Sequence, residues 1–190
     1  MATNLVDTIQ RNLGYPPLQK IDPNIQETKE QLPRQSSQRL AQAAIPAVLT
    51  CLYKFSRTDE GCEQLLRDPG SEGWLHRIFE TREKGAVDKV ALYAGIPASE
   101  AETAMKRIAD ESIAVIRGAV PQPPTCAGVR AYLDTQRHNI LVHLPAAMQM
   151  GYLLEDETLD DRTNKMEGPV SGFMHKIESL LSKGDDSKYP

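Results

Sequence analysis

Apolar residues recur at helical spacing along almost the whole chain, and the alternation that marks a half-buried strand is hard to find. At the N-terminus, an apolar stripe predicts a helix over about 4–13, which Gly14 ends. The polar segment 26–40 is read as solvated helix on both sides of Pro33. The pattern therefore predicts an all-α protein, a multi-helix bundle of about eight helices.

Two of the predicted helices are interrupted by a proline within an apolar stretch. Pro46 lies in LAQAAIPAVLTCLYKF, and Pro145 lies in NILVHLPAAMQMGYLL. Proline lacks a backbone N–H, so each helix is expected to kink, stop or restart there. Both stretches are apolar on all sides, which predicts that both are among the most buried parts of the fold.

Polar residues mark the starts of several predicted helices. Asp59 is a plausible N-cap, and Ser99 with Glu102 has the spacing of a capping box just after Pro97. Thr125 is expected to cap the helix that follows VPQPPT, residues 120–125.

The VPQPPT segment also bears on the domain organisation. We expect a single all-helical domain over 1–183 with a disordered tail over 184–190. The proline-rich segment is either a tight corner inside this domain or a linker between two halves, 1–120 and 125–183.

The last predicted helix, over 169–182, has the clearest amphipathic pattern. A helix of this length is marginal in water, so its apolar face is expected to dock on the bundle or on a partner. The apolar stripe of this helix consists of Val170, Phe173, Met174, Ile177, Leu180 and Leu181.

Composition limits the classes of function. The chain has 190 residues and a formal net charge of -4, which argues against general nucleic-acid binding because phosphate contacts need a basic surface. No stretch is apolar enough for membrane insertion, and the N-terminus lacks a signal-peptide pattern. Three cysteines without metal spacing are expected to stay free thiols in a reducing compartment, which predicts a cytoplasmic protein without a cofactor.

Polar residues gather in two stretches that are the candidates for chemistry. Asp134 lies three and four residues before Arg137 and His138, so a local ion pair is expected. His138 and His143 point about 140° apart on a helix and cannot share a zinc ion. Cys126, in the first turn of a predicted helix, is a weaker candidate nucleophile. If the two stretches meet in space, the cluster contains Asp134, Arg137, His138, Asn139, Asp160, Asp161, Arg162, Asn164, Lys165 and Glu167.

Three passages resemble the YidB-like bacterial proteins, the domain of unknown function 937. They are NLVDTIQRNLG, LAQAAIPAVLTCL followed by EGCEQLL, and VDKVALYAGIPASEAETAMKRIADESIAVI. The resemblance covers about the first two-thirds of the chain. It implies an all-helical bacterial protein with no assigned reaction, and it supplies no active-site residues.

These observations predict a non-catalytic interaction or structural module that binds an unknown protein partner or a second copy of itself. The alternative is a small-ligand-binding protein or an enzyme that uses the polar cluster of Arg137, His138 and Asn139 with 160–167.

Overall fold

The computed structural model describes residues 4–22, 24, 27–28, 35–67 and 73–151. Of these residues, 75% are helical and 3% lie in strands, which confirms the all-α class. The predicted number of about eight helices is not confirmed, since the predicted C-terminal helix lies outside the described residues. The elements are α1 (Leu5–Asn12), β1 (Ile21–Asp22), β2 (Glu27–Thr28), α2 (Ser36–Phe55), α3 (Asp59–Arg67), α4 (Trp74–Phe79), the 3₁₀ helix η1 (Glu80–Arg82), α5 (Glu83–Ala94), α6 (Ala98–Ala119), α7 (Cys126–Leu141) and the 3₁₀ helix η2 (Ala146–Met148).

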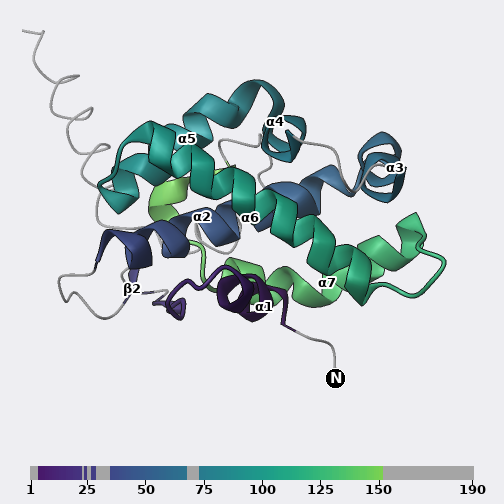
Figure 1. Ribbon diagram of the computed structural model, residues 1–190. Helices are drawn as coiled ribbons and strands as arrows, with labels where there is room; N and C mark the ends of the chain where they lie inside the picture. The colour runs from purple at the N-terminus through teal and green to yellow at the C-terminus, as the bar shows by residue number, and fades with distance from the viewer. Residues whose placement is uncertain (1–3, 23, 25–26, 29–34, 68–72, 152–190) are drawn as a thin grey trace, which may run out of the picture.

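Helix α2 is the centre of the structure, as its apolar sequence predicts. Every residue from Leu40 to Leu52 is buried, and the helix continues through Pro46 over its full length. In Figure 1, α6 crosses in front of α2, with α4 and α5 on one side and α1 and α7 on the other. One hydrophobic core includes buried side chains from each α-helix of the described residues, α1 to α7.

A buried glutamine one turn before Pro46 holds three segments together. The Gln42 side chain is 1% exposed. Its Oε1 accepts from the N–H of Gln19 at 2.8 Å, and its Nε2 donates to the carbonyl oxygens of Gln19 at 2.9 Å and His143 at 2.7 Å. Gln42 therefore fixes residue 19 and the end of the α7 region against the central helix.

The helix that leads to the second proline stops before Pro145, which is one of the outcomes expected from the sequence. α7 ends at Leu141, and Pro145 lies at the start of η2. The residue before a proline is pushed out of the helical region, so a helix normally ends before that point. Residues 140–146 are nevertheless buried or half-buried, as predicted.

Three local predictions are wrong. Asp59 is itself the first residue of α3, and the side chain of Thr58 caps this helix by accepting from the N–H of Gly61 at 3.0 Å. Residues 21–22 and 27–28 pair as a short antiparallel hairpin, where solvated helix was expected from residue 26 onward. α6 begins at Ala98 after Pro97, so Ser99 is inside the helix and makes no capping box. By contrast, Thr125 does cap α7, accepting from the N–H of Gly128 at 3.1 Å.

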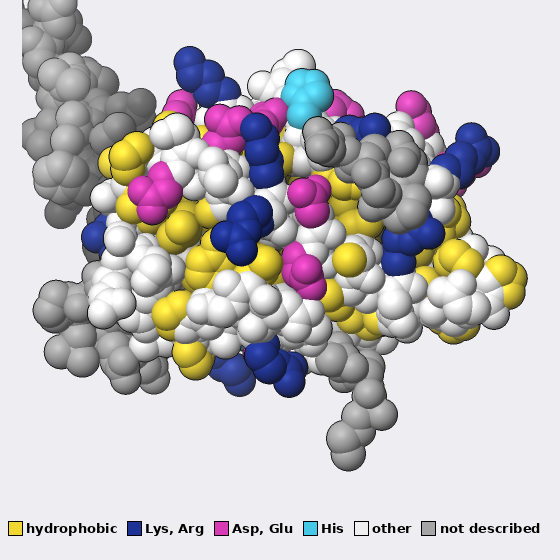
Figure 2. All heavy atoms as spheres, viewed as in Figure 1, with side chains coloured by type: hydrophobic (Ala, Val, Ile, Leu, Met, Phe, Trp, Pro, Cys, Tyr) yellow, Lys and Arg dark blue, Asp and Glu magenta, His cyan; other side chains and the backbone are white. Residues whose placement is uncertain are grey.

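The surface of the described residues mixes charges of both signs. Figure 2 shows acidic and basic side chains interspersed with hydrophobic ones on the face that contains α5 and α6. Within the described part of the chain, no helix is both long and apolar enough to cross a membrane.

Candidate functional site

Four of the ten residues of the predicted polar cluster lie on α7, and the other six, within 160–167, lie outside the described residues. The apolar stripe 170–181 also lies outside them. On α7, the Asp134 carboxylate forms an ion pair with Arg57 and accepts a hydrogen bond from the Tyr53 hydroxyl at 2.9 Å. The Asn139 carbonyl accepts from His143 Nδ1 at 2.7 Å. Asp134 therefore joins α7 to α2, a long-range contact that local spacing could not reveal.

The electrostatics of this contact agree with a structural role. The hydrogen bond from Arg57 lowers the pKa of Asp134, and the Arg57 guanidinium also lies over the Tyr53 ring. Burial, together with the hydrogen bond to Asp134, raises the pKa of Tyr53. The cavity beside Arg137 has a volume of only about 10 Å³, room for one water at most. Asp134 thus connects two helices, and the cavity beside Arg137 is too small for a ligand.

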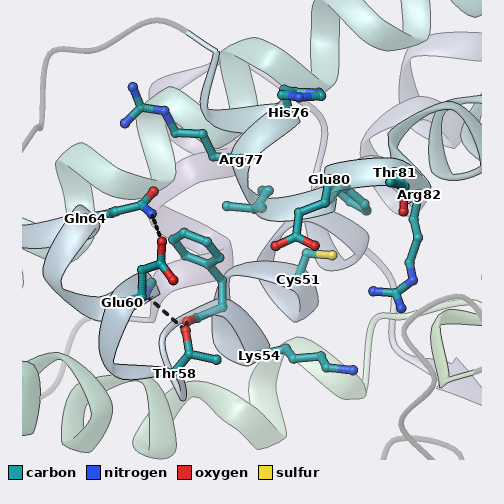
Figure 3. A pocket seen from close by; sticks show the side chains of 14 residues that line it. Cys51, Lys54, Thr58, Glu60, Gln64, His76, Arg77, Glu80, Thr81 and Arg82 are labelled. Atoms are coloured by element: carbon teal, nitrogen blue, oxygen red, sulfur yellow. Dashed lines mark hydrogen bonds between the residues drawn. The ribbon is translucent and has the colours of Figure 1, made fainter.

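A much larger cavity opens at the same, C-terminal end of α2, beside α3 and α4. It has a volume of about 610 Å³, within the usual range for ligand sites. The end of α2 forms its floor, α3 forms one wall, and α4 with η1 forms the opposite wall (Figure 3). Its lining residues are Cys51, Lys54, Phe55, Thr58, Glu60, Gly61, Gln64, His76, Arg77, Ile78, Phe79, Glu80, Thr81 and Arg82. No sequence motif connects these residues, so the sequence did not indicate this site.

The lining combines an apolar floor with a charged rim. In Figure 3 the Glu80 carboxylate lies next to Cys51, with Lys54 below this pair and Arg82 to its right. Glu60 is on the α3 side, where it accepts a long hydrogen bond of 3.4 Å from Gln64. Within the described residues, the Glu80 carboxylate makes no hydrogen bond or ion pair.

The backbone at Glu80 is strained. Its φ of 51° and ψ of -126° lie in a region that residues with a side chain rarely adopt. This conformation ends α4 and starts η1, so it aims the Glu80 side chain into the cavity (Figure 3). Strain of this kind persists where the surrounding structure enforces it, and it is concentrated at functional sites.

The Cys51 thiol on the cavity floor is not an activated nucleophile. It is 1% exposed, and burial strongly raises its pKa. His76 is at the opposite rim of the cavity, and its Nδ1 lies 2.9 Å from a Glu83 carboxylate oxygen (Figure 3). A protonated buried thiol is a poor nucleophile, so this arrangement favours binding over thiol chemistry.

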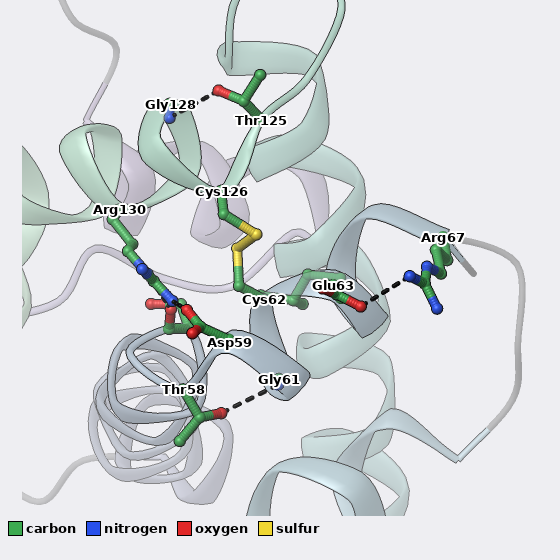
Figure 4. The surroundings of a disulfide bond; sticks show 12 residues. Thr58, Asp59, Gly61, Cys62, Glu63, Arg67, Thr125, Cys126, Gly128 and Arg130 are labelled. Carbon is green, nitrogen blue, oxygen red and sulfur yellow. Dashed lines mark hydrogen bonds and ion pairs between the residues drawn. A yellow bond between two sulfur atoms is a disulfide. The ribbon is translucent and has the colours of Figure 1, made fainter.

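The prediction of three free thiols is wrong. Cys62 on α3 and Cys126 at the start of α7 form a disulfide (Figure 4). The two cysteines are 64 residues apart in sequence, but packing of the two helices brings their Cα atoms to 5.7 Å, within the range for a disulfide. The sulfur of Cys126 is therefore committed to this bond, although its position in the first turn of a helix was predicted correctly.

Other contacts also hold α3 in place. Arg130 donates to the Ser56 carbonyl at 2.9 Å and pairs with Asp59 at 2.8 Å (Figure 4). Arg117 donates to the carbonyls of Leu65 and Leu66 at the other end of the helix.

The described residues contain no group of three or more His, Cys, Asp or Glu side chains placed to hold a metal ion. No family model, curated protein or solved structure matches this chain.

Proposed function

We propose that this protein is a non-catalytic interaction module, and that the cavity between α2, α3 and α4 binds a short peptide segment of a protein partner through a basic side chain. The observation that carries the proposal is the cavity of about 610 Å³ with the Glu80 carboxylate directed into it. The resemblance to YidB-like proteins and a cytoplasmic location stay predictions. The cytoplasmic location was inferred from three free cysteines, and the disulfide removes this support.

The charges of the lining support a basic ligand group. Lys54, Arg77 and Arg82 each already interact with another group of the protein. For Arg77, one such contact is with the Trp74 ring, whose centre is 5.0 Å from the guanidinium carbon. The Glu80 carboxylate is the charged group of the lining with which a basic ligand group can pair. A charge-assisted hydrogen bond to a carboxylate is among the stronger polar contacts.

The apolar floor supports a side chain with an aliphatic stem. Lysine and arginine bury their methylene groups against apolar surface while the charged end reaches a polar partner. Phe55, Ile78 and Phe79 provide this surface below the charged rim. A basic side chain thus fits both parts of the lining.

A selection from a displayed library of short random peptides tests the proposal. We expect enriched peptides to contain lysine or arginine, and Glu80→Gln to weaken their binding about tenfold, as loss of one charged hydrogen bond does. Glu100→Gln is the matched control, because Glu100 is exposed in the first turn of α6 and does not line the cavity. Selected peptides that bind Glu80→Gln as tightly as the native protein would contradict the proposal.

A further inference from the structure

We propose that the Cys62–Cys126 disulfide is a redox-sensitive tie that holds the α3 wall of the cavity in place, so that its reduction opens the cavity. The inference concerns the opening of the cavity and not its occupant, so it stands independently of the proposed function. Its basis is the position of the bond. Cys62 lies on α3 between the cavity-lining residues Glu60, Gly61 and Gln64.

Besides the disulfide, α3 is held by the Arg117 hydrogen bonds to the Leu65 and Leu66 carbonyls at its C-terminal end and by the Arg130–Asp59 ion pair at its first residue. The helix has nine residues, too short to be stable alone, and its buried positions are Gly61, Cys62 and Leu65. The Asp59 side chain that pairs with Arg130 is 92% exposed, and ion pairs at such positions contribute little. The Cys62 anchor is thus a large part of what fixes the wall.

The two sulfur atoms differ in access. Cys62 is fully buried, whereas Cys126 is half-buried at the first residue of α7. An external thiol reductant therefore attacks the Cys126 sulfur, the S–S bond breaks, and Cys62 leaves as a thiolate that takes up a proton. A second reductant thiol then attacks the mixed disulfide. It releases Cys126, which becomes a thiol, and the two reductant sulfurs end as a disulfide.

The third cysteine reports on the state of the cavity. Cys51 is on the cavity floor and is 1% exposed, so an alkylating reagent reaches it only when a wall moves. Because Cys51 is not part of the disulfide, the oxidised protein and a Cys62→Ser/Cys126→Ser double variant each contain Cys51 as a free thiol.

The experiment measures the alkylation rate of Cys51 by N-ethylmaleimide, resolved by peptide mass spectrometry. Three samples are compared, namely the oxidised protein, the protein reduced with dithiothreitol and then freed of it, and the double variant. We expect Cys51 to react at least about tenfold faster in the reduced protein and in the double variant, as local opening of one element allows. Hydrogen exchange should rise in α3 and stay unchanged in α6.

Global unfolding is distinguished by a matched core variant. Ile9→Ala on α1 lowers overall stability at a fully buried position away from α3. We expect this variant to accelerate Cys51 alkylation far less than reduction does. Equal alkylation in the oxidised and reduced proteins would overturn the proposal. So would equal acceleration by Ile9→Ala, or unfolding of the whole chain on reduction.

Discussion

Replacing Gln42 with leucine tests whether one buried side chain holds three segments of the fold together. The substitution keeps the approximate size of the side chain but removes its three hydrogen bonds to backbone groups of Gln19 and His143. Each bond of this kind contributes about 1 kcal/mol net, and a buried partner left unsatisfied costs more. Gln19 is half-buried, so water replaces part of its loss. We expect Gln42→Leu to lower the free energy of unfolding by about 3 kcal/mol.

Urea denaturation followed by far-ultraviolet circular dichroism measures this change, with the slope of the transition expected to stay constant. Gln10→Leu is the matched control. The Gln10 side chain accepts one hydrogen bond, from the Leu18 N–H at 3.3 Å, so its loss should cost about 1 kcal/mol or less. If both variants lose the same small amount of stability, water satisfies the three backbone groups and the reasoning is refuted.

Three further predictions concern the disulfide, the α2–α7 ion pair and the strained residue. Thiol titration of the denatured, unreduced protein should find one free thiol, and a count of three would show that Cys62 and Cys126 are not bonded. The pKa of Asp134 is lowered, so its pair with Arg57 stabilises the fold above the ordinary pKa of an aspartate and loses this effect as pH falls through the lowered value. Asp134→Asn should therefore reduce the loss of stability on acidification. The effect should be well under 1 kcal/mol because both side chains of the pair are exposed, and thermal melts between neutral and acidic pH measure it. Glu80→Gly should raise the free energy of unfolding by about 1 kcal/mol while weakening peptide binding, and a loss of stability would show that the backbone there is not strained.

Helical periodicity predicted most of the architecture because the apolar faces that it identifies are the faces that pack. The residues flanking Pro46 are apolar on every side, and the structure places them at its centre. The hairpin at 21–22 and 27–28 was not predicted because strands of two residues are too short to show alternation of apolar and polar residues. Ser99 and Glu102 had the right spacing for a capping box, but the N-cap of the helix is Pro97, two residues before Ser99.

The cavity was beyond sequence analysis for a different reason. Its lining residues are not far apart in sequence, but the packing of the helices determines which of their side chains face one another across the cavity. Glu80 adopts a backbone conformation usually reserved for glycine, and nothing in its residue type indicates this. The partners Arg57 and Asp134, and likewise Cys62 and Cys126, are brought together across long separations by the packing of α2 and α3 on α7.

The tie between α3 and α7 also sets the order in which the cavity is completed during synthesis. Every lining residue lies between Cys51 and Arg82, so all of them leave the ribosome before Cys126 does. Until α7 has been made and has packed, the α3 wall lacks its covalent anchor. A nascent or prematurely ended chain that lacks α7 thus contains the whole set of lining residues without the covalent anchor of the α3 wall.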